Sequence, residues 1–137
     1  MTILLTRSDL ESVLTPADCL TSVEEAFRNY GEGRTAAPKS LGLHAPAGTF
    51  HVKAATSDVC AIKINANFPG NPTRHQLPTI QGVIVLMDME RGTPLAILDS
   101  AFITTLRTAA ATAVAAKHLA REDGATIPLF GCATQGP

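Results

Sequence analysis

Cysteine is scarce in this sequence of 137 residues, and its placement excludes several kinds of site. Cys19, Cys60 and Cys132 are an odd number at wide and irregular intervals, which fits neither a disulfide framework nor a set of zinc ligands. The four histidines are also scattered, and no Ser-His-Asp set or pair of catalytic carboxylates can be assembled. We therefore expect no metal site and a reducing, cytoplasmic environment.

An excess of charge of one sign is lacking as well, and so are long apolar runs. The formal net charge is −1 and no basic run occurs, whereas nucleic-acid-binding proteins typically carry clustered Lys and Arg. No apolar run approaches the roughly 20 residues that span a bilayer, and the short apolar start soon meets Arg7 and Asp9, unlike a signal peptide. We expect a soluble protein with neither nucleic acid nor membrane as a partner.

Hydrophobic residues make up 45% of the sequence, which is enough for one domain with a core. Ser8, with Glu11 three residues later, predicts a brief helix that runs to Leu14. Thr15 predicts the start of an amphipathic helix that ends near Gly31. Either Asp99 or Ser100 is expected to cap an alanine-rich helix that runs to about Arg121.

Short β-type runs broken by Gly, Pro and Asn fill the region between residues 40 and 100. Strands are predicted at 3–5, 41–45, 49–56, 60–68, 79–88, 93–98 and 125–130. A hairpin turn is expected at 90–92, and a long loop that is rich in turn formers at 68–76. The pattern predicts an α+β fold with a mostly antiparallel sheet and flanking helices.

Alternation along 60–68 separates polar from apolar side chains. Lys63, Asn65 and Asn67 share one face of this strand, while the other face is apolar. By the same count His51 and Lys53 share a face of the preceding strand. The polar face can be a binding surface or the solvent face of a half-buried sheet, and spacing alone favours the solvent face.

Arg107 stands immediately before a run of small residues. A lone guanidinium in this context suits an anion such as a carboxylate, but an exposed Arg whose stem lies along apolar surface fits the pattern equally well. Gly131, Ala133 and Gly136 approximate a dinucleotide-binding turn after a strand. As an isolated motif, an ordinary glycine-rich turn is the preferred interpretation.

The ordered series of motifs resembles the ornithine cyclodeaminase and mu-crystallin family over essentially the whole chain. The segments are APK (37–39), FHVKAA (50–55), KINANFPGN (63–71), LPT (77–79), GTPLA (92–96), LDS (98–100), TTLRTAA (104–110) and AAKHLAR (115–121). The family includes cyclodeaminases, archaeal-type alanine dehydrogenases and cyclic imino acid reductases. The resemblance implies a substrate-binding and dimerisation domain at 1–124, and at 125–137 the first strand and glycine turn of a truncated Rossmann domain.

Roles for individual residues follow only from this resemblance. It implies that Lys63 is catalytic and contacts the substrate near its reacting centre. Arg107 would hold the carboxylate of an amino or imino acid, with Thr79 and Lys39 as further substrate contacts. The residues implied to approach the phosphates of NAD or NADP are Thr108, Gly131, Ala133 and Gln135.

Two departures from the family pattern concern the cofactor and the chemistry. Ala133 replaces the second glycine of the turn, and the catalytic aspartate that the family places in its later domain is absent. We therefore expect either the front part of an NAD(P)-dependent amino-acid oxidoreductase or deaminase, or a non-catalytic dimeric module that binds a small carboxylate without a cofactor. A homodimer is implied in both cases.

Overall fold

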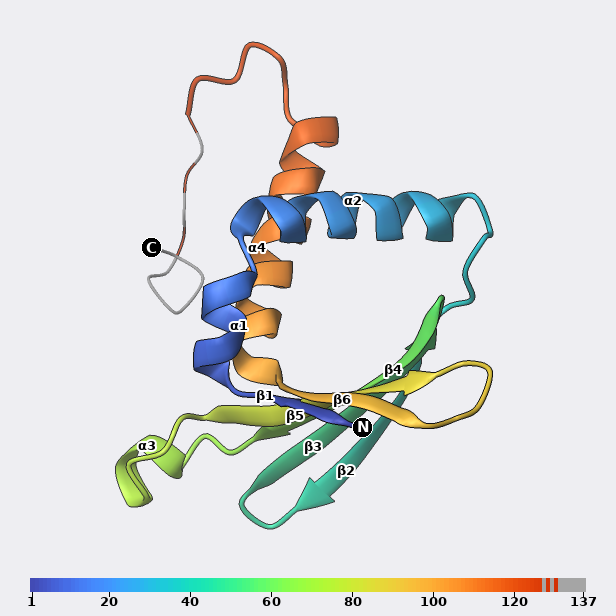
Figure 1. Ribbon diagram of the computed structural model, residues 1–137. Coiled ribbons are helices and arrows are strands. Elements are labelled where there is room, and N and C mark those ends of the chain that lie inside the picture. The colour runs from blue at the N-terminus through green and yellow to red at the C-terminus, as the bar shows by residue number, and fades with distance from the viewer. Residues whose placement is uncertain (127, 129, 131–137) are drawn as a thin grey trace.

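The computed structural model describes residues 1–126, 128 and 130, and its three longer helices lie on one side of a single sheet (Figure 1). In chain order the elements are β1 (Ile3–Leu5), α1 (Arg7–Val13), α2 (Pro16–Gly31), β2 (Lys39–Ala45), β3 (Gly48–Thr56), β4 (Val59–Asn67), α3 (Asn71–Arg74), β5 (Ile80–Asp88), β6 (Pro94–Asp99) and α4 (Ser100–Leu119). The predicted α+β class is confirmed.

The sheet has six strands in the order β1-β6-β5-β4-β3-β2. Strands β2 to β6 follow one another as antiparallel neighbours, and β1 pairs in parallel with β6. The predicted turn between β5 and β6 contains Gly92 at a positive φ of 65°, a conformation that glycine adopts without steric cost. The mostly antiparallel sheet is therefore confirmed.

Threonine and aspartate side chains set the starts of the helices. Thr15 caps α2 through a reciprocal bond with Asp18, as the sequence indicates, and Asp99 caps α4. The cap predicted at Ser8 is wrong, because Thr6 and Asp9 form the capping box of α1 and Ser8 lies inside the helix. A threonine that accepts from the third backbone N–H starts the helix two residues earlier.

The ends of two predicted elements also differ. Helix α4 ends at Leu119 rather than Arg121, and the guanidinium of Arg121 bonds Asp123 outside the helix at 2.6 Å. The predicted loop at 68–76 contains the single turn α3. The strand predicted at 125–130 is absent at the residues described there, while Ile127, Leu129 and 131–137 lie outside the described residues.

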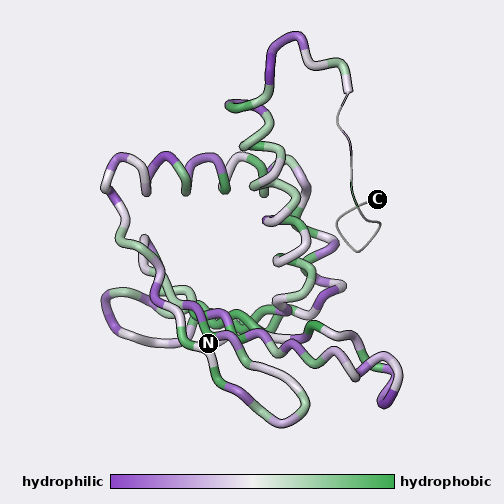
Figure 2. The backbone as a smooth tube through the Cα atoms, turned by 180° about the vertical axis from the view of Figure 1, so that it is seen from behind, coloured by the Kyte–Doolittle hydropathy of each residue, from purple (hydrophilic) through white to green (hydrophobic). Residues whose placement is uncertain are grey.

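The core lies between the sheet and helices α1 and α4. Leu10 of α1 packs with Ile84, Ala96 and Leu98 of β5 and β6. Helix α2 packs mainly on α4, and its hydropathy alternates along its length (Figure 2). Within the described ranges, no helix is long and apolar enough to cross a membrane.

Candidate functional site

Three cations from three elements line one small cavity. Strands β3 and β4 pair so that Lys53 lies directly opposite Lys63, and α4 adds Arg107 from above this face of the sheet. The cavity has a volume of about 280 Å³, and its lining is Pro38, Lys53, Ala54, Ala55, Ala61, Lys63 and Arg107. Apart from the three charged groups, the side chains of this lining are apolar and small.

The polar face of β4 is turned toward α4, so the preferred interpretation of that face as a solvent face is wrong. Asn65, two residues from Lys63, accepts a hydrogen bond at 2.6 Å from Ser100 Oγ at the start of α4. Ser100 is fully buried, whereas Ile64 on the opposite face is 38% exposed. Helices α1 and α4 cover this side of the sheet, where Leu10 packs with core residues of β5 and β6 and where the bond from Ser100 ties α4 to β4.

Electrostatics at the cavity disfavour positive charge on Lys63. Partial burial lowers the pKa of the Lys63 ammonium group, and the nearby charges of Arg107 and Lys53 lower this pKa further. In the described part of the chain, none of the three cations forms an ion pair, and no group of His, Cys, Asp and Glu could hold a metal ion. An anion in this cavity would relieve the repulsion.

Next to the site, the backbone of Gly82 lies close to the side chains of Asn65 and Ser100. A Cβ atom at Gly82 of β5 would lie 2.6 Å from Asn65 Oδ1 and 2.8 Å from Ser100 Oγ. Glycine is therefore needed for the bond that ties β4 to α4. The sequence pattern did not predict the contact of Ser100 with Asn65 or the role of Gly82, although a glycine inside a strand often marks such an approach.

The predicted substrate contacts fall into two groups. Lys63 and Arg107 both line the small cavity, and the roles that the resemblance implies for them stay predictions. Lys39 begins β2 beside the lining residue Pro38 without lining the cavity itself. Thr79 precedes β5 and lies five residues from Ile84, the partner of Lys63, which is about 16 Å along a strand. The roles of Lys39 and Thr79 stay predictions.

The predicted cofactor contacts are described only at Thr108. Its hydroxyl donates a hydrogen bond at 2.7 Å to the backbone carbonyl of Thr104, so its single proton already has an acceptor in the helix. Gly131, Ala133 and Gln135 lie outside the described residues. The part of the chain that the structure describes does not by itself make up a dinucleotide site.

A second and larger cavity adjoins the first. Its volume is about 670 Å³, and it lies between α2 and the ends of β3 and β4. Val23, Phe27 and Tyr30 of α2 give it an apolar wall, and it shares the lining residues Pro38, Ala55 and Ala61 with the smaller cavity. Together they form a continuous hollow beneath α2.

The family model of the ornithine cyclodeaminase/mu-crystallin family matches residues 1–137. The chain belongs to this family. It is 36% identical over 135 residues to alanine dehydrogenase of Archaeoglobus fulgidus, a match that covers 98% of this chain and 42% of that protein. A putative dehydrogenase of Rhizobium meliloti is also 36% identical, again over 42% of its length. The chain thus spans less than half the length of these curated relatives.

Solved structures show the same fold. An archaeal alanine dehydrogenase dimer with bound NAD superposes with a TM-score of 0.93 and 36% identity, covering 98% of this chain and 42% of that one. The Δ1-pyrroline-2-carboxylate reductase of Thermococcus litoralis, in complex with NADH and L-proline, gives a TM-score of 0.82 at 35% identity, covering 88% and 39%. The sheet and its helices match the N-terminal domain of such enzymes.

Proposed function

We propose that the chain is the substrate-binding and dimer-forming portion of a cytoplasmic, NAD(P)-dependent amino-acid oxidoreductase or deaminase. The observation that carries the proposal is the cavity where Lys63 and Arg107 meet with no acidic side chain in the lining. A relative with the same fold is in complex with L-proline, whose carboxylate is the kind of anion that such a cavity suits.

Each of the two cations has a separate task in this proposal. Arg107 presents a planar guanidinium, which can bind both oxygens of a carboxylate through paired hydrogen bonds. Lys63 stands on the rigid β4 strand and holds an ammonium group whose pKa is lowered, so it can donate a proton more readily than an ordinary lysine. The carboxylate would thus be fixed by α4 and the reacting end of the substrate placed near β4.

The cofactor belongs to the proposed activity of the whole protein. NAD or NADP would supply the exchange of hydride with the α-carbon. Because the described residues do not make up its site, we assign no step of the reaction to the cofactor here. A non-catalytic module that binds a small carboxylate remains the competing proposal for the chain by itself.

The apolar face of the sheet supports the dimer-forming part of the proposal. Cross-strand pairs place two contiguous apolar rows on this face, which we call the open sheet face; its residues are Leu41, Leu43, Phe50, Val52, Ile64, Ala66 and Val83. Leu41 is 56% exposed and Leu43 is 50% exposed. Exposed apolar patches of this kind mark interaction sites, and the archaeal alanine dehydrogenase relative is a dimer.

Calorimetric titration of the chain with L-alanine, L-proline and L-ornithine tests the binding proposal. We expect saturable binding that Arg107→Ala weakens by about 10- to 100-fold, because hydrogen bonds to charged groups contribute about 1.5–3 kcal/mol. Arg91→Ala is the matched control, since Arg91 lies in the β5–β6 turn. Equal affinities for the two variants would contradict the proposal. Titration with NADH and NADPH separates it from the cofactor-free module, because saturable binding would exclude that module.

A further inference from the structure

Lys53 has no task in the proposed function, yet its position is fixed by the fold. The pairing of β3 with β4 sets it directly opposite Lys63, and both side chains line the same cavity as Arg107. Like charges that lie directly opposite in a sheet are destabilising. His51 is the other basic side chain on this face of β3, and its ring contacts the Thr49 hydroxyl at 3.1 Å.

The charges in the cavity exceed what a simple amino acid can balance. A zwitterionic amino acid such as alanine carries one carboxylate and one ammonium group, so its net charge is zero. Its carboxylate would offset only part of the repulsion among the three cations, because its own ammonium group adds a positive charge to the cavity. A second anionic group on the substrate would provide the missing negative charge and give Lys53 a partner.

We propose that Lys53 selects an amino or imino acid that carries a second anionic group, such as a dicarboxylate. This inference rests on the proposed function, since Arg107 and Lys63 are taken to hold the α-carboxylate end. Lys53 reaches the cavity from the neighbouring strand, so it can meet the second anionic group while the first stays on α4. The cavity of about 280 Å³ fits a small compound rather than a nucleotide.

The same geometry argues against a diamine in this cavity. A second ammonium group would need an acidic partner, and the lining of the cavity contains none. Glu25 and Asp58 line the neighbouring, larger cavity beyond Ala55 and Ala61. L-Ornithine is therefore the probe that distinguishes the two arrangements, because its side chain would have to extend toward those acids.

The test is a calorimetric titration of the chain with L-aspartate, L-glutamate, L-alanine and L-ornithine. We expect one of the two dicarboxylates to bind at least about 10-fold more tightly than L-alanine, and added salt to reduce that preference. Lys53→Gln should weaken dicarboxylate binding and so remove the preference, whereas Lys53→Arg should retain it. Arg91→Gln also removes one positive charge, but in the β5–β6 turn outside the lining of the cavity, so it should change the affinity neither for the dicarboxylates nor for L-alanine.

Each outcome separates this inference from the proposed function. If the dicarboxylates and L-alanine bind alike and Arg107→Ala weakens both, the inference is wrong and the proposed function stands. If L-ornithine binds most tightly, or if Lys53→Gln keeps the preference, the assignment of Lys53 is overturned. If the folded chain binds none of the four compounds, both proposals fail for this chain.

Discussion

At Lys63 the fold places an ammonium group among other cations and removes it in part from water. Burial and the neighbouring charges both disfavour the charged form of Lys63, so this side chain destabilises the fold when no ligand is bound. Sites of this kind are expected where function, rather than folding, selects the residue.

Replacing Lys63 with Met should therefore raise the thermal stability of the ligand-free chain at pH 7. Met keeps an unbranched apolar stem and removes the charge. Because the folded-state pKa of Lys63 lies below its usual value of 10.5, the unfolded chain binds more protons between these two values. Wild-type stability then rises with pH across that window, so the advantage of the variant should shrink as pH approaches 10.5.

Thermal unfolding of both proteins at pH 7 and pH 10 checks this expectation. Lys117→Met is the matched control, because Lys117 forms an ion pair with Glu24 at 2.9 Å and its loss should not stabilise the chain. A Lys63→Met variant that unfolds at a lower temperature than wild type at pH 7 would show that the ammonium group has a stabilising partner.

The sequence predicts some features of the site and not others, for a physical reason. Alternation shows that Lys53 and Lys63 each face one side of a strand, but a shift of one residue in pairing moves a whole strand to the other face. Only the register of β3 against β4 shows that the two lysines are opposite each other. Arg107 could be placed at the site from the resemblance, whereas its pattern alone left two interpretations open.

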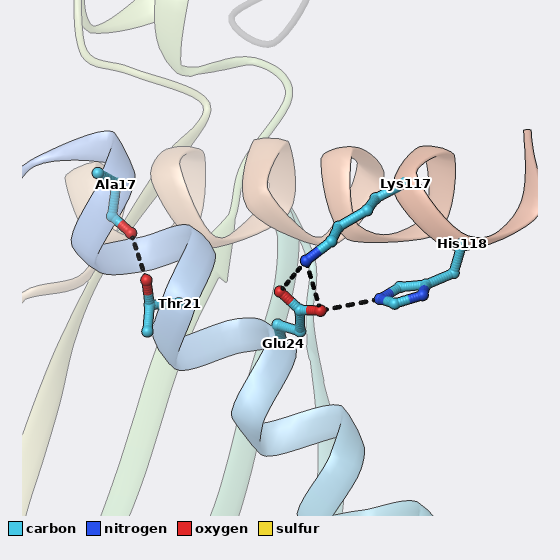
Figure 3. Close-up of polar contacts among 5 residues, drawn as sticks. All are labelled: Ala17, Thr21, Glu24, Lys117 and His118. Carbon is cyan, nitrogen blue, oxygen red and sulfur yellow. Dashed lines mark hydrogen bonds and ion pairs between the residues drawn. The ribbon is translucent and has the colours of Figure 1, made fainter. Parts of the chain in front are cut away.

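Among the elements, α2 depends on α4 for its position, since it packs mainly on that helix. Glu24 of α2 accepts hydrogen bonds at 2.9 Å from the Lys117 ammonium group and contacts the His118 ring at the same distance (Figure 3). The hydrogen bond from Lys117 lowers the pKa of the Glu24 carboxyl group most, followed by the bond to His118. This link joins the helix that walls the larger cavity to the helix that carries Arg107.

We expect Glu24→Gln to loosen α2 at neutral pH. The lowered pKa means that Glu24 stabilises the fold above its usual value of 4.5, and this contribution is lost as pH falls through the folded-state pKa. Amide hydrogen exchange in α2 should therefore be faster in the variant at pH 7, and the unfolding temperatures of the two proteins should converge once the pH falls below the folded-state pKa of Glu24. Glu25→Gln, one residue further, should behave as wild type.

If exchange in α2 is unchanged at pH 7, the packing of apolar side chains on α4 holds α2 without this link.

The elements themselves were largely predictable, because Thr15, Asp99 and the turn at Gly92 carry strong local signals. The start of α1 was not, since Thr6 and Ser8 both have hydroxyl groups and only the bond to Asp9 distinguishes them. The arrangement in which α2 packs on α4 depends on tertiary contacts that no local pattern contains.

For the molecule as a whole, the sheet separates two surfaces of different composition. The face toward the helices carries the cations and the small core around Leu10, and the open sheet face is apolar and is not covered by the described residues of the single chain. Covering such a face with a second copy removes apolar surface from water and so lowers the free energy. Two open sheet faces would pack as the sheets of a sandwich do, with the cavity lined by Lys63 and Arg107 on the outer side of each copy.

Ile64→Glu should weaken or abolish the homodimer, because it places a carboxylate in the middle of the open sheet face at a position that is 38% exposed. A stable interface buries about 800 Å² on each partner, and an unpaired charge at its centre costs several kcal/mol. Sedimentation equilibrium measures the effect, with Val13→Glu as the control, since Val13 ends α1 on the other side of the sheet and is 64% exposed. A monomeric wild-type chain would show that no second copy covers this face, and equal dimerisation of wild type and Ile64→Glu would show that the dimer forms through another surface.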